Sequence, residues 1–489
     1  MLRCLTRRIH KILKTSFELS GETAVYVTDK NAPKRIIKET ALEDLKNTKA
    51  VWLYPKKDYK RTLVLQVSKE DEVFSSACSA VSALKSRKIT NADVFFPKSF
   101  KDEQVIKWVN TAMLANYDYS LKTIEKQTSD QESEPEKGPT YIENLNLSYK
   151  FASEEDFNYS ISSAANSLYA RDLANTRGSI ATPEFIHKKV LELVETHKDS
   201  IEIEVIEGEA LQNQGLSLLY NVGKGAQSQP RLIVLKYSGH ENPEETLALV
   251  GKGLTFDTGG LNLKPTNNIE DMYLDKSGAC AALGAFKWVV ENKIKINLVC
   301  TLALAENAIS SRSYKPLDIL TSLKGKTVEI GNTDAEGRLC LADALTYTQQ
   351  KYKPSTIIDL ATLTGACVVA LGEETAGAFG NNSKLIGKLK NAGSFYQENI
   401  WEMPINEEHE KTIKGKNADI SNIGKSRYGG ACSAAAFLKH FIEKGVNWAH
   451  LDIAGPAMSK SDRGQFSAGG TGFGVQLLTR FILNEQIKK

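Results

Sequence analysis

The charged residues that could share one reaction centre are concentrated between residues 250 and 345. Three segments carry them: VGKGLTFDTGG with Lys252 and Asp257, MYLDKSGA with Asp275, and NTDAEGRLCLADAL with Asp334, Glu336 and Arg338. Four of these residues are carboxylates, whose combined charge two divalent cations would neutralise. Burying them together without cations would be very costly. Two ions about 3.5–4 Å apart are a common arrangement for activating a water molecule and stabilising the resulting oxyanion.

The segment around Asp257 also suggests two other chemistries. Asp-Thr-Gly is the tripeptide of aspartic proteases, but those enzymes need two carboxylates sharing a proton. The chain has one such tripeptide, so a second copy would have to come from a symmetric dimer. Gly-Lys-Gly hints at a phosphate-binding loop, which requires G-x-x-x-x-G-K-[ST]. Thr246 replaces the first glycine and Gly253 follows Lys252, so this interpretation fails.

The metal hypothesis predicts an oxygen-rich site. In an extended segment alternate side chains share a face, so Asp334 and Glu336 can point at one centre. None of the seven histidines lies in these motifs, and oxygen ligands admit Mn²⁺ or Mg²⁺ as well as Zn²⁺. Lys252 can add a nitrogen ligand only as the neutral amine.

The surrounding sequence predicts the elements that hold these residues. Five apolar runs read as buried strands: RLIVLKY, TLALVGKG, INLVCTLAL, STIIDLATL and WAHLDIAG. Helical segments lie between several of them: ACAALGAFKWVVEN, LADALTYTQQKY and SAAAFLKHFIEK. This alternation favours an α/β fold with a mostly parallel sheet flanked by helices. Ligands of such sheets bind beyond the carboxyl ends of the strands.

The organisation of the chain is predicted as a smaller domain followed by a larger catalytic one. We expect an N-terminal α/β domain over residues 18–150, a linker helix over 151–178 and the catalytic domain over 179–489. The runs AVYVTD, AVWLYP and RTLVLQV read as strands of the first domain, and FSSACSAVSALKSR reads as a helix. The polar segment KQTSDQESEPEKGPTY reads as an exposed loop or linker.

Composition limits the partners and the compartment. The 489 residues carry a net charge of +3, so nucleic acid is not expected as the main partner. The longest apolar run contains Asp359 and is too short for a membrane span. Seven scattered cysteines without a CxxC motif fit a reducing compartment. Residues 1–17 are basic, acid-free and amphipathic, which favours a mitochondrial transit peptide, with the cytoplasm as the alternative.

Taken together, these motifs resemble the leucyl aminopeptidase family of dinuclear metallopeptidases, the cytosolic aminopeptidases. The resemblance rests on VGKGLTFDTGG, LNLKP, MYLDKSGA, NTDAEGRLCLADAL and LATLTGA, in that order and spacing. It extends from about Ala165 to the C-terminus, whereas the N-terminal domain matches only in length and general character. The resemblance implies an enzyme that releases N-terminal residues, preferably leucine-like ones, from peptides, and it implies a homohexamer.

The resemblance also implies roles for individual residues. One ion, Zn²⁺ or Mn²⁺, would be held by Lys252, Asp257, Asp275 and Glu336, and a second by Asp257, Asp334 and Glu336. Lys264 would polarise the scissile carbonyl, and Arg338 would hold a bicarbonate that acts as general base. The pocket for the N-terminal side chain would be lined by Met272, Thr362, Gly365, Ala454 and Ala457.

One departure and two rival functions remain. Lys276 follows Asp275 where the family usually has methionine, which brings an extra positive charge near the proposed metals. The rival enzyme is an aspartic-type protease built on Asp257. The rival without catalysis is a binding protein, because some bacterial members of the family also bind DNA; the near-neutral charge makes that a secondary role at most.

Overall fold

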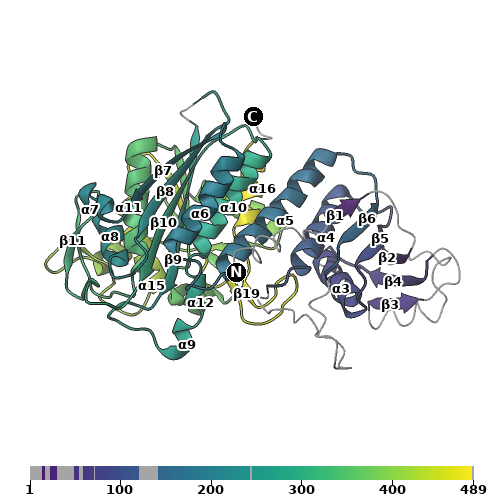
Figure 1. The fold of residues 1–489 in the computed structure, drawn as a ribbon, viewed down its shortest axis with the longest axis horizontal. Helices are drawn as coiled ribbons and strands as arrows, with labels where there is room; N and C mark the ends of the chain where they lie inside the picture. The colour runs from purple at the N-terminus through teal and green to yellow at the C-terminus, as the bar shows by residue number, and fades with distance from the viewer. Residues whose placement is uncertain are drawn as a thin grey trace, which may run out of the picture. The chain divides into compact units, whose positions relative to one another are not determined.

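The computed structural model describes residues 14–16, 22–29, 49–53, 59–70, 72–119, 141–242 and 245–486 (Figure 1). The chain divides into two compact units. The first comprises Met1–Leu168 together with Ser461–Ala468, and the second comprises Tyr169–Lys460 and Gly469–Lys489. The division falls inside helix α5 (Glu154–Asn175), which occupies most of the expected linker segment.

The first unit contains a six-stranded sheet in the order β1-β6-β5-β2-β4-β3. All its neighbouring strands run parallel except β3, which is antiparallel to β4. Within the described residues of this unit, helices α3 and α4 lie between its strands in sequence. The elements are β1 (Lys14–Ser16), β2 (Thr23–Thr28), β3 (Ala50–Leu53), β4 (Arg61–Gln66), α3 (Glu72–Ser86), β5 (Asn91–Phe95), α4 (Asp102–Ala115) and β6 (Asn144–Ser148).

The second unit is built on an eight-stranded sheet in the order β15-β14-β17-β13-β9-β10-β8-β7. Its four central strands, β17, β13, β9 and β10, are mutually parallel. The strands are β7 (Ile201–Glu207), β8 (Arg231–Ser238), β9 (Thr246–Asp257), β10 (Asn297–Asn307), β13 (Thr356–Ala361), β14 (Thr375–Gly380), β15 (Asn399–Glu402) and β17 (Asn447–Asp452). The mixed α/β architecture with a largely parallel central sheet confirms the predicted fold class.

Helices cover both faces of this sheet (Figure 1). Helix α10 packs on one face of β9 and α11 on the other. The helices are α6 (Pro183–Thr196), α7 (Glu209–Asn213), α8 (Ser217–Gly223), α9 (Thr266–Ile269), η1 (Met272–Leu274), α10 (Ser277–Glu291), α11 (Gly337–Tyr352), α12 (Gly365–Leu371), α13 (Ser383–Phe395), α14 (Glu407–Thr412), α15 (Gly430–Lys439) and α16 (Val475–Gln486). Short strands complete the unit: β11 (Ile319–Thr321), β12 (Thr327–Glu329), β16 (Ile420–Ser421), β18 (Met458–Ser459) and β19 (Gly469–Gly470).

The central strands are apolar because both of their faces are buried. Every residue of β9 is buried except Phe256, which is partly exposed. Continuous burial of this kind explains the uninterrupted apolar runs in the sequence. Two charged residues, Lys252 and Asp257, are the exceptions to the apolar pattern of β9, which marks the strand as more than a core element.

Three predictions concern the N-terminal segment, the polar segment and membrane-spanning helices. The proposed transit peptide lies outside the described residues except for β1, which pairs in parallel with β6. Cleavage after residue 17 would therefore remove an edge strand of the first sheet. The polar segment 126–141 lies outside the described residues apart from Tyr141. Within the described part of the chain, every helix is too short or too polar to cross a membrane.

Candidate metal centre

The four predicted carboxylates meet at the carboxyl end of the central strands. Asp257 ends β9, Asp275 lies between η1 and α10, and Asp334 and Glu336 precede α11. One oxygen from each of Asp257, Asp334 and Glu336 lies within 4.8 Å of the others. Asp275 joins them through the shared partner Lys252. Segments far apart in sequence therefore bring their acids to one place, at the end of the sheet where ligands of parallel sheets bind.

The segment that carries Asp334 and Glu336 is a turn, not the extended strand that the sequence analysis expected. The Asn332 side chain accepts a hydrogen bond from the Asp334 backbone N–H at 2.8 Å, and Glu336 already has helical dihedrals. The reason is local, because an asparagine side chain that accepts from the backbone two residues later stabilises a turn. The two carboxylates still converge, although the alternation of an extended segment is not the cause.

Lys252 lies in the middle of β9 and points toward the start of α11. Its Nζ donates to Asp275 Oδ1 at 2.8 Å and to the Thr362 carbonyl at 2.9 Å, and it lies 3.0 Å from Glu336 Oε1. A Cβ atom on Gly337 would stand 2.4 Å from Cε of Lys252. A larger residue at the start of α11 would therefore have to displace the end of the lysine side chain.

A tight turn after Asp257 brings Lys264 to the same carboxylate cluster. Gly259 has φ of +87°, and the Lys264 backbone N–H donates to the Thr258 carbonyl at 2.9 Å. The turn places Lys264 Nζ 2.9 Å from Asp257 Oδ2 and 2.5 Å from Asp334 Oδ1. The positive φ explains why a glycine follows Asp257-Thr258.

The electrostatics of the cluster are dominated by burial and by crowding of like charges. Burial, with repulsion from Glu336 and Asp275, raises the pKa of Asp257 to about 8. Burial likewise raises the pKa of Asp275 to about 6, against the opposing effect of Lys252. Burial lowers the pKa of Lys252, but the surrounding carboxylates outweigh it and hold that pKa above its usual value. The two ammonium groups balance only half of the charge that the four carboxylates carry when all of them are ionised.

The donor set fits divalent metal ions. Asp275 Oδ2 and Glu336 Oε2 are buried without a hydrogen-bond partner, a state that ordinarily costs the full desolvation of the atom. Carboxylate oxygens are the ligands that Mn²⁺, Mg²⁺ and, to a lesser degree, Zn²⁺ accept. Binding of a cation by Lys252 would require loss of its proton, which a nearby metal ion promotes. The four carboxylates can therefore bind cations in addition to the two lysine ammonium groups.

A cavity of about 230 Å³ lies directly over this cluster. Every predicted site residue except Arg338 lines it, including the proposed pocket residues Met272, Thr362, Gly365, Ala454 and Ala457. Thr362 Oγ1 also donates to Asp275 Oδ1 at 2.7 Å. Small and apolar residues form part of the wall: Gly365 and Val368 of α12, and Ala454, Gly455 and Ala457 after β17.

Arg338 lies behind the cluster on the first turn of α11. Its Nη1 donates to the Asn422 carbonyl at 2.7 Å, while its Nε is buried without a partner. Burial lowers the pKa of Arg338 to about 10, so the guanidinium remains charged at neutral pH. A buried cation with an unused donor is suited to an anion.

Lys276 does not direct its charge at the carboxylates. The side chain is fully buried, and its Nζ donates to the carbonyls of Ala174 at 3.0 Å and Thr176 at 2.8 Å and to that of Tyr273. Ala174 lies in the last turn of α5, where carbonyls lack intrahelical partners. The lysine therefore joins the end of α5 to the η1–α10 corner that carries Asp275.

The sequence analysis did not predict the residues that hold together the loops carrying the four carboxylates. Asn307, at the end of β10, donates to Asp257 Oδ1 at 2.8 Å. Asn422 is fully buried and bonds the backbone of residues 331, 332 and 335. Glu373 and Lys460 form an ion pair at 2.9 Å on the cavity wall. Single polar residues at strand ends and in loops give no periodic signal, so only the fold reveals these contacts.

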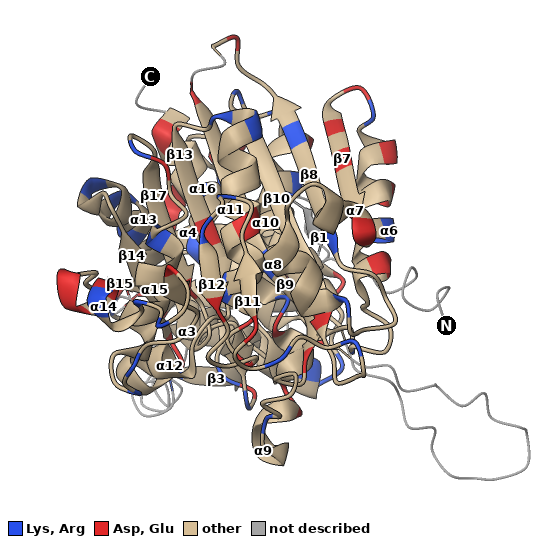
Figure 2. Cartoon of the chain, turned by 90° about the vertical axis from the view of Figure 1, so that its left-hand side faces the viewer, with Lys and Arg blue, Asp and Glu red and all other residues tan. Residues whose placement is uncertain are grey.

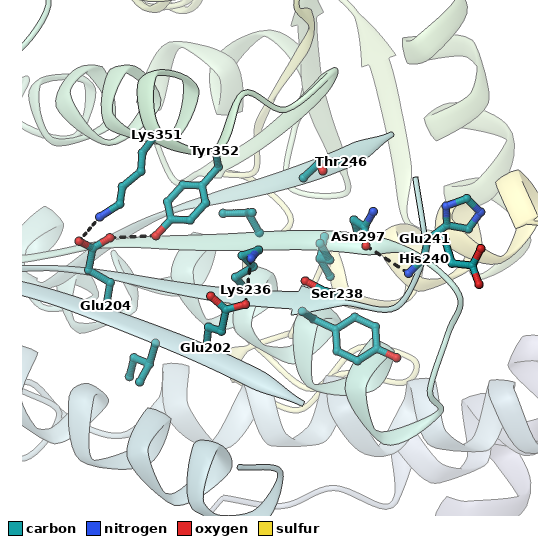
Figure 3. A pocket seen from close by; sticks show the side chains of 14 residues that line it. Glu202, Glu204, Lys236, Ser238, His240, Glu241, Thr246, Asn297, Lys351 and Tyr352 are labelled. Carbon is teal, nitrogen blue, oxygen red and sulfur yellow. Dashed lines mark hydrogen bonds and ion pairs between the residues drawn. The ribbon is translucent and has the colours of Figure 1, made fainter. Parts of the chain in front are cut away.

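A second cavity, of about 770 Å³, lies at the amino ends of β9 and β10 (Figure 3). Figure 3 shows several of its charged side chains directed at one another. Lys236 pairs with Glu202 at 2.8 Å, and Glu204 binds Lys351 and the Tyr352 hydroxyl. Because these two acids already have partners, this cavity offers no comparable excess of buried carboxylate.

Comparison with known proteins identifies the family. The model described as "Cytosol aminopeptidase family, catalytic domain" matches residues 168–479. The chain belongs to the cytosol aminopeptidase family. It is 45% identical over 316 residues to a probable cytosol aminopeptidase of Aquifex aeolicus, covering 64% of this chain and 63% of that protein. It is 42% identical over 316 residues to the cytosol aminopeptidase of Rickettsia prowazekii, again covering 64% and 63%.

The likeness in sequence is confined to part of each relative, but the likeness in structure is broader. The chain spans less than two thirds of the length of the curated relatives that it matches. The solved structure of the bottromycin maturation enzyme BotP in complex with Mn has a TM-score of 0.83 and 26% identity, covering 96% of this chain and 100% of that chain. A second structure of BotP has a TM-score of 0.82 and 25% identity, with the same coverage. Both units therefore have counterparts in a solved protein.

Proposed function

We propose that the protein is a di-metal aminopeptidase that hydrolyses the N-terminal bond of peptides. The observation that carries the proposal is the excess of buried carboxylate at the cavity floor, with two oxygens lacking partners. Membership of the cytosol aminopeptidase family supports it. The manganese of the related BotP complex supports Mn²⁺ as one ion, and Zn²⁺ remains the second candidate.

The ligand assignment divides the cluster between two ions. Lys252, Asp257, Asp275 and Glu336 would hold one, and Asp257, Asp334 and Glu336 the other. When bound, such ions lower the pKa of a water molecule and stabilise developing negative charge. The short distances among Asp257, Asp334 and Glu336 support shared ligation by the first and last of them.

Lys264 is the residue best placed to act on the substrate carbonyl. Its side chain is 15% exposed at the cavity, whereas that of Lys252 is 3% exposed. Once Asp257 and Asp334 serve as ligands, the Lys264 ammonium is left to donate to the carbonyl oxygen of the scissile bond. A fixed cation acts mainly on the transition state, where that oxygen carries negative charge.

The cavity wall supports a preference for leucine-like N-terminal residues. Gly365, Ala454 and Ala457 leave space, and Met272 supplies an apolar, adaptable contact. Arg338 is proposed to hold a bicarbonate that acts as general base, and its unpartnered Nε supports anion binding at this position. A bound anion of this kind would accept the proton that the attacking water loses.

Hydrolysis of leucyl-amide and of N-acetyl-leucyl-amide, each with and without a chelator, tests the function. We expect turnover of the free amine only, loss of activity with the chelator, and recovery with Mn²⁺, Co²⁺ or Zn²⁺. An aspartic-type protease built on Asp257 would behave differently. Inhibition by a pepstatin-like compound together with indifference to chelation would favour that alternative and overturn the proposal.

Assembly, location and domain roles are further parts of the proposal. We propose a homohexamer, which light scattering would contradict by showing a catalytically competent monomer. Residues 1–17 are proposed to direct the protein to mitochondria, and a reporter fusion that stays in the cytosol would assign it to the cytoplasm. The catalytic domain is proposed to span residues 179–489. Figure 2 shows acidic and basic residues interspersed along the chain, and this distribution of charge supports peptides rather than nucleic acid as partners.

A further inference from the structure

Asn307 connects the two halves of the candidate metal centre. It is the last residue of β10 and lies opposite Asp257 in the parallel ladder. The side chain is 1% exposed, and its Nδ2 donates to Asp257 Oδ1 at 2.8 Å and to the Thr333 carbonyl at 3.1 Å. One amide group thus links the end of β9 to the loop that carries Asp334 and Glu336.

The same residue also holds the turn that leads to Lys264. The Asn307 carbonyl accepts from the Thr258 N–H at 3.0 Å and from Thr258 Oγ1 at 2.7 Å. Asp257 Oδ1 accepts from Asn307 and from the Gly259 N–H at 2.9 Å, whereas Asp257 Oδ2 faces Lys264. Two donors on one oxygen fix the carboxylate plane and leave the other oxygen directed into the cavity.

The orientation of the Asn307 amide follows from these contacts. Its Oδ1 is buried without a hydrogen-bond partner. Rotating the amide by 180° would place that oxygen against Asp257 Oδ1, where two acceptors would repel. The amide therefore presents its donor to Asp257 and to the Thr333 carbonyl and leaves its own buried oxygen unpaired.

We propose that Asn307 is a positioning residue for the metal centre. It orients Asp257 and sets the spacing between Asp257 and the Asp334–Glu336 loop, so that all three can bind the same pair of ions. The inference rests on the proposed metallopeptidase function. Partners that orient a metal ligand typically change metal affinity by about 10–100-fold when removed.

The same strand provides a matched control at its other end. Asn297, the first residue of β10, is 7% exposed, and its side chain donates to the Asn242 carbonyl at 2.7 Å and accepts from the His240 N–H at 3.1 Å. It therefore shares residue type, strand, burial and number of side-chain hydrogen bonds with Asn307, but it lies away from the carboxylates.

The test compares Asn307→Ala with Asn297→Ala in the full-length protein. Mn²⁺ binding to metal-stripped protein is measured by calorimetry, and thermal unfolding is followed without metal. We expect both variants to lose metal-free stability, but only Asn307→Ala to lose Mn²⁺ affinity, by about 10–100-fold. Unchanged affinity in Asn307→Ala, or an equal loss in Asn297→Ala, would overturn the inference.

A second variant and the metal binding of the unaltered protein complete the test. If Asn307→Ala does not fold, Asn307→Ser replaces it, because the hydroxyl can still donate one hydrogen bond. We then expect weaker Mn²⁺ binding than in the unaltered protein, and unchanged binding would count against the positioning role. Failure of the unaltered protein to bind Mn²⁺, Zn²⁺ or Co²⁺ would instead refute the proposed function itself, and the inference with it.

Discussion

The two ends of the central sheet carry cavities that differ in charge balance. The cavity at the amino ends of β9 and β10 is the larger, and Glu202 and Glu204 there are paired with lysines on the partly exposed surface (Figure 3). At the carboxyl ends the cavity is smaller, and acids outnumber the lysines that contact them. Exposed ion pairs contribute little and need no further partner. Buried excess charge does need one, so charge balance is a better guide than cavity size to where a cation would bind.

The largest effect is expected when one acid is removed from each end of the sheet, which tests whether the two cavities differ in metal binding. Asp257→Ala should lose bound metal and abolish hydrolysis, because Asp257 is proposed to serve both ions. Glu204→Ala should leave metal content and kcat unchanged, since Glu204 bonds Lys351 and Tyr352 at the opposite end of the sheet. Metal analysis and leucyl-amide assays provide the measurement.

The opposite result would have a clear meaning. If Glu204→Ala lost metal, the amino-end cavity would be the metal site, and the argument from unpaired oxygens would be wrong. If Asp257→Ala kept two ions per subunit and activity, the carboxyl-end cluster would not be the catalytic centre.

A smaller effect is expected from the lysines at the two ends. Lys264→Ala should lower kcat by about a hundredfold, the scale seen when one oxyanion donor is removed. Its metal content should stay near that of the unaltered protein, because Lys264 is not a ligand in this assignment. Lys236→Ala is the control at the amino end, where the lysine pairs with Glu202, whose side chain is 72% exposed. Steady-state kinetics and metal analysis distinguish the two variants.

Loss of metal in a folded Lys264→Ala protein would contradict the assignment. Lys252 and Lys264 would then have to exchange roles, with Lys264 as the ligand. The contacts of Lys264 with Asp257 and Asp334 make this a real test, because both lysines lie within ion-pair distance of proposed ligands.

The sequence predicted that the carboxylates converge, because its signals are local. Apolar runs indicated the central strands, and the four carboxylates in three short motifs indicated the cluster. The outer strand β14 was missed because TAGAFG contains no β-branched residue after Thr375. Close packing explains this composition, since a Cβ on Gly380 would stand 2.3 Å from the Trp448 carbonyl oxygen. Small residues required by tertiary contact carry no strand signal of their own.

The supporting contacts could not be predicted for a different reason. Asn307 reaches Asp257 across 50 residues of sequence, and Asn422 reaches the 331–335 loop across about 90. Such pairs depend on strand order and loop path, which are set by the whole fold. Family resemblance supplied roles for the lysines that residue type alone left open, but it did not indicate where the Lys276 ammonium points.

The smallest effect is expected from Lys276, which is near the metal centre in sequence yet directed away from it. Lys276→Met should leave metal content and kcat within about twofold, because the ammonium donates to backbone carbonyls rather than to the carboxylates. The free energy of unfolding should change by less than about 2 kcal/mol, since relief from burying a charge offsets three lost hydrogen bonds. Metal analysis, kinetics and denaturant unfolding provide the measurements.

Lys252→Met is the matched comparison, because both lysines are almost fully buried and lie within one unit. That variant removes the partner of Asp275 and Glu336 and should lose metal and activity together. If Lys276→Met also lost metal, the positive charge beside Asp275 would contribute to the centre through space. The charge balance at each end of the sheet would then have to count charged groups that do not contact the carboxylates directly. The difference between the two ends could no longer be judged from the ion pairs alone.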